Sequence, residues 1–181
     1  MIALETTRLL FRDHEPSDLE PFCAMEADPE VRRFVGGRPR SRAEAEQKFN
    51  SVYLPPIPNR MGLWATALKP SGLYIGYCGV YPHFSEAGVI PCEGTLAFYL
   101  ARANWRQGLA TDAGTAFVAF AFAELHLTRL VATVQVGNDA SVRVLEKLGF
   151  SWQRREEGDL RSYNHFELPM HNAQPPRDMA T

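Results

Sequence analysis

The spacing of apolar residues divides the chain into short strand-like runs and a few longer helical segments. The strand-like runs are apolar or alternating and end at turn residues such as Gly and Pro; they occupy residues 8–12, 63–69, 73–81, 95–100, 130–136, 150–152 and 161–168. Helical patterns begin after Asp18 and after Ser41, and they end at Asp28-Pro29 and near Tyr53. Segment 82–92 follows neither pattern and predicts a loop of about ten residues, long enough to suggest a function.

Two further helices are expected in the second half of the chain. Residues 109–124 are apolar on nearly every side, which predicts a buried helix, and Gly114 would let it pack closely against a sheet. Another helix begins after Asn138, a favourable N-cap, and stops at Gly149. With no internal repeats, this order of elements predicts an α+β fold in which helices cover a mainly antiparallel sheet. Residues 1–170 are expected to form a single domain, and residues 171–181 a flexible tail.

Composition narrows the class of protein further. The chain has 181 residues, 45% of them hydrophobic and 22% charged, with a net charge of −2, all ordinary for a soluble globular protein. Because basic residues are not in excess, the charge of the chain does not indicate a nucleic-acid partner. Three cysteines, Cys23, Cys78 and Cys92, lack metal-type spacing and predict reduced thiols and no metal site. No signal peptide or membrane span is apparent, so we expect a cytoplasmic protein without a membrane partner.

A candidate anion site lies between the strand-like run 95–100 and the buried helix. The chain there reads Asn-Trp-Arg-Gln-Gly-Leu-Ala-Thr-Asp-Ala, residues 104–113, and Gly108 keeps side chains away from the turn. The first N–H groups of a helix have no intrahelical partner, and the macrodipole adds partial positive charge. A phosphate or diphosphate suits such a turn, and Arg102 and Arg106 would reinforce it. Taken alone, the pattern also fits a plain strand–helix turn.

A second block follows at residues 138–150 and reads Asn-x-x-Ser-x-x-x-Leu-Glu-Lys-Leu-Gly-Phe. Together with Trp-x-x-Gly-Leu-Ala-Thr-Asp-Ala at 105–113, it resembles the two signature blocks of the GNAT superfamily of N-acetyltransferases. The opening Thr-Arg-Leu-Leu-Phe-Arg at 7–12, with Asp18-Leu19, resembles the Rim-type branch, the ribosomal-protein-alanine acetyltransferases and their small-molecule relatives. The resemblance covers residues 6–168. It implies the GNAT (acyl-CoA N-acyltransferase) fold, a mixed, mainly antiparallel sheet with splayed central strands and helices on both faces.

The resemblance also implies acetyl-CoA as the cofactor and assigns residues to it. The backbone amides that would hold the diphosphate are those of Arg106, Gln107, Gly108, Leu109, Ala110 and Thr111. The pantetheine arm would lie between the splayed strands like an extra strand, against Phe98, Tyr99 and Leu100. Strand core is the alternative role for these three residues, and both roles are compatible because the cofactor would use backbone atoms.

The helix that begins after Asn138 carries three more implied cofactor contacts. Asn138 would bind the pantetheine arm, Ser141 would lie near the sulfur, and Arg143 would meet the 3′-phosphate together with Lys147. From residue type alone, Asn138 and Ser141 more often serve the start of a helix. Arg143 and Lys147, one turn apart, are also typical of an exposed helix face.

Acetyl transfer requires a polarised carbonyl, a proton for the departing thiolate and a neutral amine. The resemblance implies the Leu100 amide as the oxyanion donor. Many members carry an acid tyrosine at the position of Leu145, so Ser141 or water would donate the proton here.

The general base is less well defined. Related branches often carry a glutamate where this chain has Thr95. Glu93 lies two residues earlier and on the same face of an extended strand, so it is our candidate for accepting the amine proton or attracting a cationic substrate. A solvated charge at a strand end is the alternative. His83 and His165 are weaker candidates, and the cysteines lack a histidine partner in the sequence.

The expected activity is therefore transfer of an acetyl group from acetyl-CoA to a primary amine by direct attack. The acceptor would be a small-molecule amine or a protein N-terminal α-amine. A weak base favours α-amines, with a pKa near 7.7–8.0, over lysine near 10.4. The alternative, kept open by Thr95, is a non-catalytic acyl-CoA-binding or sensor protein of the same fold. A monomer and a homodimer are both compatible with the exposed strand edges expected here.

Overall fold

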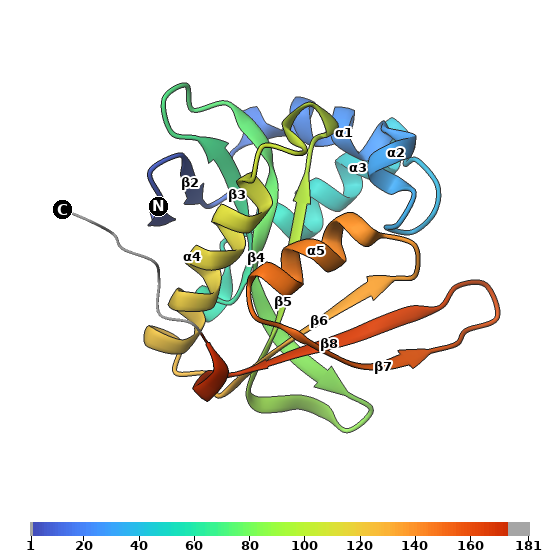
Figure 1. Cartoon of the computed structure of the whole chain (residues 1–181). Coiled ribbons are helices and arrows are strands. Elements are labelled where there is room, and N and C mark those ends of the chain that lie inside the picture. The colour runs from blue at the N-terminus through green and yellow to red at the C-terminus, as the bar shows by residue number, and fades with distance from the viewer. Residues whose placement is uncertain (1, 174–181) are drawn as a thin grey trace.

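The computed structural model describes residues 2–173 and is built on one eight-stranded sheet (Figure 1). The strand order is β1-β2-β3-β4-β5-β6-β8-β7, and all neighbours are antiparallel except β5 and β6. The strands are β1 (Ile2–Glu5), β2 (Leu9–Arg12), β3 (Gly62–Leu68), β4 (Tyr74–Ser85), β5 (Gly88–Leu100), β6 (Arg129–Gln135), β7 (Ser151–Glu156) and β8 (Tyr163–Pro169).

Helices cover both faces of the sheet (Figure 1). On one face lie α1 (Leu19–Ala27), α2 (Pro29–Arg32) and α3 (Arg42–Lys48); on the other lie α4 (Leu109–Ala123) and α5 (Asp139–Lys147). The π-helical turn η2 (Phe49–Tyr53) continues α3, and the short 3-10 segments are η1 (Pro16–Asp18), η3 (Pro58–Arg60), η4 (Arg102–Asn104) and η5 (Met170–Asn172). This arrangement confirms the predicted α+β class and the mixed, mainly antiparallel sheet.

The local signals that predicted the helices act as expected. Ser41 caps α3 by accepting a hydrogen bond from the Glu44 amide at 3.3 Å, and the Glu44 carboxylate accepts one from the Ser41 amide at 2.8 Å. This reciprocal capping box satisfies two amides that the helix itself leaves unpaired.

None of the helices in the described part of the chain is long and apolar enough to cross a membrane.

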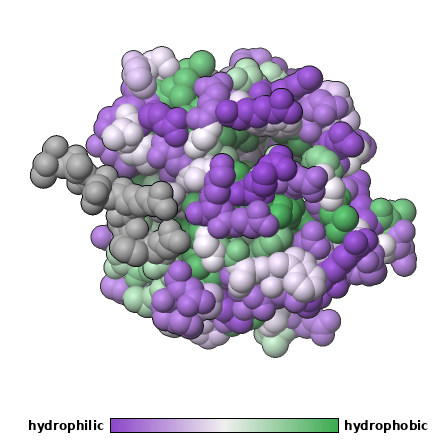
Figure 2. All heavy atoms as spheres, in the orientation of Figure 1, coloured by the Kyte–Doolittle hydropathy of each residue, from purple (hydrophilic) through white to green (hydrophobic). Residues whose placement is uncertain are grey.

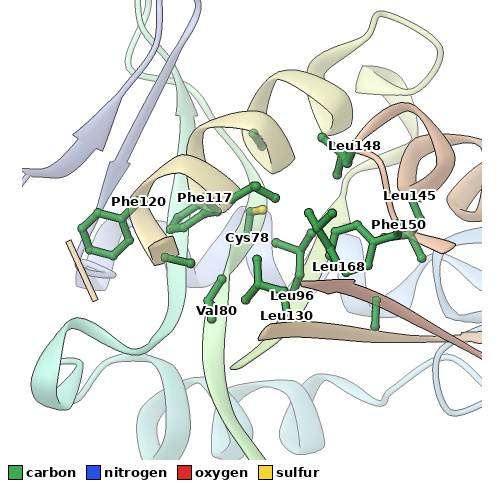
Figure 3. Packing of buried hydrophobic residues seen from close by; sticks show 14 of the residues in the cluster. Cys78, Val80, Leu96, Phe117, Phe120, Leu130, Leu145, Leu148, Phe150 and Leu168 are labelled. Carbon is green, nitrogen blue, oxygen red and sulfur yellow. The ribbon is translucent and has the colours of Figure 1, made fainter. Parts of the chain in front are cut away.

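The hydrophobic core has two parts, one on each face of the sheet. The larger part packs α4 and α5 against the strands, with Phe117, Leu130, Leu145 and Leu168 among its fully buried members (Figure 3). Gly114 contributes to this packing differently from our expectation: a Cβ there would lie 2.5 Å from Leu148 Cδ1. The glycine therefore admits the end of α5 rather than the sheet. The second part is rich in aromatic rings and lies under α1 and α3.

The two central parallel strands separate along their length. β5 pairs with β6 at Glu93↔Arg129, Gly94↔Leu130 and Thr95↔Val131, and the described residues beyond that point form no further pairs between them. β5 nevertheless continues to pair with β4 as far as Leu100, and β6 with β8 as far as Gln135. The strands are thus held on their outer sides and open toward their C-terminal ends. The expected splay is confirmed, and we call the gap between the two strands the splay.

Two expectations about the strands were wrong. Segment 82–92 is not a ten-residue loop, because β4 runs to Ser85 and β5 begins at Gly88, with Phe84 paired to Val89 across a tight hairpin. A register shift in this hairpin and the exposure of both side chains explain why no alternating pattern marks it. Strand β1 was also missed. Of the expected tail, residues 171–172 belong to η5, and residues 174–181 lie outside the described part.

Candidate functional site

The turn before α4 leaves backbone donors free for an external anion. Gly108 is the N-cap of α4 with a left-handed φ of 75°, and in the described structure no side chain caps this helix. The first bond of the helical type runs from the Asp112 amide to the Gly108 carbonyl, at 3.0 Å. The amides of Leu109, Ala110 and Thr111 therefore lie before the first hydrogen bond of the helix and have no carbonyl partner within it. Since α4 has 15 residues, its dipole adds positive potential there. We call residues 106–111 the anion turn.

Arg8, near the N-terminus of the chain, stabilises this turn through side-chain hydrogen bonds. Its Nη1 donates to the Gln107 carbonyl at 2.9 Å, and its Nε donates to Asp112 Oδ2 at 3.1 Å. Thr6 Oγ1 donates to the same carboxylate oxygen at 3.1 Å. The β1–β2 turn thus supports the loop and neutralises the acidic residue in the first turn of α4. The Thr-Arg-Leu motif is visible in the sequence, but a role of Arg8 in the site was not predicted from it.

The open edge of β5 presents backbone groups to the splay. The Ala101 amide donates to the Ile75 carbonyl at 2.8 Å, so Ala101 points its N–H toward β4. Because successive amides of a strand point to opposite sides, those of Phe98 and Leu100 point toward β6. The Leu100 carbonyl accepts a bond from Trp105 Nε1 at 2.7 Å, which ties the strand end to the anion turn. Figure 2 shows the surface hollowed between this loop and α5.

The start of α5 forms the other side of this hollow. Asn138 caps the helix, because its Oδ1 accepts a hydrogen bond from the Ser141 amide at 3.2 Å. Arg143 is exposed on the same helix, as is Lys147 one turn later. Leu145, at the position where many superfamily members carry a tyrosine, is fully buried in the larger core (Figure 3). The capping role of Asn138 is therefore observed, and contacts of these residues with a cofactor stay predictions.

Glu93 is held in a network at the closed end of the splay. Its Oε2 lies 2.9 Å from His83 Nδ1, and its Oε1 accepts a hydrogen bond from Arg129 Nη2 at 2.6 Å. Burial raises the pKa of this carboxyl, and the hydrogen bonds from His83 and Arg129 outweigh that effect, so the pKa is lowered. With its side chain only 13% exposed, Glu93 is not a solvated strand-end charge. The contacts favour a structural role, and the lowered pKa weakens Glu93 as a proton acceptor.

The structure brings the anion turn, the end of β5 and the start of α5 together, and it separates Glu93 from them. Glu93 lies near the middle of β5 and Leu100 at its end, seven residues or about 23 Å apart along the strand. A base must come within hydrogen-bond reach of its proton, directly or through one water. This separation and the paired carboxylate weaken Glu93 as the base for an amine that attacks a carbonyl held at Leu100, and the roles of both residues stay predictions.

The other predicted candidates lie elsewhere. His165 Nε2 is 3.0 Å from Glu156 Oε2, at the outer strands of the sheet. Cys78 is fully buried, whereas Cys92 is exposed, and both carry free thiols. Neither cysteine lies in the anion turn or at the open end of β5, so the site is formed without them.

The arrangement fits a coenzyme A thioester. The amides that precede the α4 ladder suit a diphosphate, and the unpaired edge of β5 suits an extended arm that carries amide groups. A fold with these two features is typical of acyl-CoA-dependent acyltransferases.

Comparisons with known proteins agree with this class. Residues 8–151 match the family model described as an acetyltransferase (GNAT) domain. An uncharacterised N-acetyltransferase, p20 of Bacillus licheniformis, is 29% identical over 167 residues, which cover 90% of this chain and 88% of that protein. The chain belongs to the GNAT acetyltransferase family, whose members use acetyl-CoA, and it is an N-acetyltransferase.

Solved structures share the fold. A GNAT-family acetyltransferase from Bacillus anthracis superimposes with a TM-score of 0.78 at 20% identity, covering 93% of this chain and 97% of that one. Spermidine N-acetyltransferase from Vibrio cholerae, solved with CoA and spermine, gives a TM-score of 0.73 at 17% identity, with 92% and 98% covered. These likenesses confirm the expected GNAT fold.

Proposed function

We propose that this enzyme transfers the acetyl group of acetyl-CoA directly to a primary amine, and that the diphosphate binds at the anion turn. The observation that carries the proposal is the α4 N-terminus, which no side chain of the described residues caps and which lies beside the open end of β5. Bound acetyl-CoA supplies an acetyl thioester. The amides of Leu109, Ala110 and Thr111 hold its anionic part, and the edge of β5 orients its arm.

In this proposal, two groups of the chain assist the reaction. The Leu100 amide donates a hydrogen bond to the thioester oxygen, where negative charge develops; one such donor lowers a barrier by about 3 kcal/mol. Ser141, in the first turn of α5, provides a hydroxyl that delivers a proton to the sulfur. Asn138 and Arg143 supply further contacts to the cofactor from the same helix.

The acceptor we propose is an amine that needs little help to lose its proton. Glu93 is ion-paired and lies far from Leu100 along the strand, so its predicted role as a base is not supported by its contacts. An α-amine with a pKa near 7.7–8.0 is partly neutral at physiological pH, whereas a lysine amine is not. This favours a protein N-terminal α-amine, as the Rim-type motif at residues 7–12 suggests, or a small-molecule α-amine.

Two assays test this function. We expect CoA to raise the melting temperature by mass action, since it binds the folded state. We also expect thiol release from acetyl-CoA with at least one α-amine. No thermal shift with CoA would contradict the cofactor site. A shift without turnover on any amine would favour the second candidate, a non-catalytic acyl-CoA-binding protein, which Thr95 in place of the family glutamate supports.

A further inference from the structure

Gln135 is the last residue of β6 and lies at the open end of the splay. Its neighbours on the strand, Ala132 and Val134, belong to the larger core under α4 and α5. Because successive side chains of a strand point to opposite faces, that of Gln135 points to the α1–α3 face. Tyr99 of β5 packs against the aromatic core on that same face. Gln135 and Tyr99 therefore flank the splay on the side opposite to α4.

The side-chain oxygen of Gln135 is buried and unpaired within the described structure. None of the described residues donates a hydrogen bond to its Oε1. Most buried polar atoms in native proteins have a partner, and leaving one without a partner is destabilising. An amide oxygen can accept a hydrogen bond from an N–H group of a bound molecule. The Gln135 oxygen is therefore free to bind a ligand that enters from the α1–α3 face.

A loop from the α1–α3 face reaches the end of β6. Residues 33–37, which we call the strap, follow α2, and Figure 1 shows this loop beside the turn between β6 and α5. Phe34 lies against that turn, because a Cβ on Gly137 would be 3.7 Å from Phe34 Cε1. Arg32, at the start of the strap, lies close to Tyr99: burial raises the pKa of Tyr99 to about 12, and the charge of Arg32 opposes this rise. The strap therefore extends from the side of β5 to the side of β6.

Arg161, in the turn between β7 and β8, holds the strap in place. Its Nη2 donates a hydrogen bond to the Gly36 carbonyl at 3.0 Å. The guanidinium also packs on Gly37, where a Cβ would overlap the same nitrogen. The β7–β8 turn is itself joined to the end of β6, because the Val136 amide donates to the Ser162 carbonyl at 2.9 Å. The strap and this turn thus enclose the end of β6 on the α1–α3 face.

Gln135 and Leu100 lie at similar distances from the point where the two strands separate. The last pair between β5 and β6 is Thr95↔Val131. Leu100 follows five residues later on β5, about 16 Å along the strand, and Gln135 follows four residues later on β6, about 13 Å along it. A thioester held at Leu100 would therefore have Gln135 on the opposite side of the splay.

We propose that Gln135 accepts a hydrogen bond from the first peptide N–H of a peptide-like acceptor, so that the enzyme selects α-amines followed by an amide group. The inference rests on the proposed function and narrows its substrate class. A cofactor bound at the anion turn occupies the α4–α5 face, so the amine approaches from the face where Gln135 lies. Only Cα and the carbonyl carbon separate the peptide nitrogen from the α-amine, which therefore extends from Gln135 into the splay. A polyamine has no amide beside its amine and cannot make this contact.

Two acceptors that differ in one N–H group test the inference. Alanine N-methylamide and alanine methyl ester share the same α-amine, and only the amide can donate to Gln135. We expect kcat/KM in the wild type to be at least tenfold higher for the amide. The two values should be nearly equal in Gln135→Met, which keeps the length of the side chain and removes the oxygen. No preference in the wild type, or an unchanged preference in Gln135→Met, would overturn the inference.

Thr133→Val is the matched control, because it removes a polar group from the same face of β6 two residues earlier. We expect this variant to keep the wild-type preference for the amide. An equal loss of preference in Thr133→Val and Gln135→Met would contradict a specific contact with Gln135.

Stability distinguishes this role from a structural one. Removing an unpaired buried oxygen removes the cost of burying it, so the melting temperature of Gln135→Met should equal or exceed that of the wild type. A lower melting temperature would show that the oxygen supports the fold and would contradict the inference.

Binding decides the inference even without turnover. Failure of CoA to bind, or of any amine to react, would count against the proposed function. Alanine N-methylamide can still be titrated into the protein by calorimetry, and we expect it to bind at least fivefold more weakly to Gln135→Met than to the wild type. Equal binding, or no binding to the wild type, would overturn the inference.

Discussion

Replacing Arg8 by methionine tests whether the β1–β2 turn supports the anion turn. The substitution keeps an unbranched side chain and removes the guanidinium, with its bonds to the Gln107 carbonyl and to Asp112. Arg8 is 48% exposed, so its ion pair contributes about 0–1 kcal/mol to stability. The bond to the carbonyl contributes about 1 kcal/mol. A loss of about 1–2 kcal/mol corresponds to a melting temperature about 3–6 °C lower for a chain of this size.

The effect on CoA affinity decides what Arg8 does for the site. Without Arg8, the Asp112 carboxylate in the first turn of α4 lacks its ion-pair partner, and the loop loses a tether. We expect CoA to bind about tenfold more weakly by calorimetry, which corresponds to about 1.4 kcal/mol. Arg154→Met is the matched control, because it removes a similarly exposed ion pair of 2.9 Å far along the chain. A lowered melting temperature with unchanged CoA affinity in Arg8→Met would refute the argument.

Three further changes test other parts of the account. Gly108→Asp and Gly108→Ala both strain a backbone with φ of 75°, so the difference between the two variants reports the effect of the added negative charge. We expect CoA to bind about 30-fold more weakly to Gly108→Asp than to Gly108→Ala. Equal affinities would place the diphosphate elsewhere. Glu93→Gln should lower the free energy of unfolding by about 1–2 kcal/mol and leave the pH dependence of kcat unchanged; a shifted pH profile would restore Glu93 as a base. Burial lowers the pKa of His14 from 6.5 to about 4, so the unfolded state takes up its proton first and stability falls as pH drops through that window. Urea unfolding would measure this loss between pH 7 and pH 4. The free energy of unfolding should fall by about 2–3 kcal/mol less in His14→Phe than in the wild type. An identical fall in both proteins would contradict the assignment.

Much of the fold could be predicted from local sequence patterns. Ser41 and Glu44 form a capping box within one helical turn, and Gly108 and Gly149 stand at helix ends, so each signal could be recognised from neighbouring residues. The splay was different, because no spacing of apolar residues shows where two strands stop pairing. That expectation came from the resemblance of the two motif blocks to the GNAT superfamily.

Contacts between distant residues could not be predicted from the sequence. Arg8 and Asp112 are 104 residues apart, and either one alone is an ordinary surface charge. The sequence around Glu93 looks the same whether its carboxylate is solvated or is paired with Arg129, which lies 36 residues later. The hairpin 82–92 was missed for another reason: strands that extend beyond the core bury neither face and show no alternation.

A crystal structure of the CoA complex tests the central claim most directly. We predict diphosphate oxygens within about 3 Å of the amides of Leu109, Ala110 or Thr111, and a pantetheine arm along β5 at Phe98 and Leu100. A diphosphate bound away from the anion turn, or an arm outside the splay, would contradict the account.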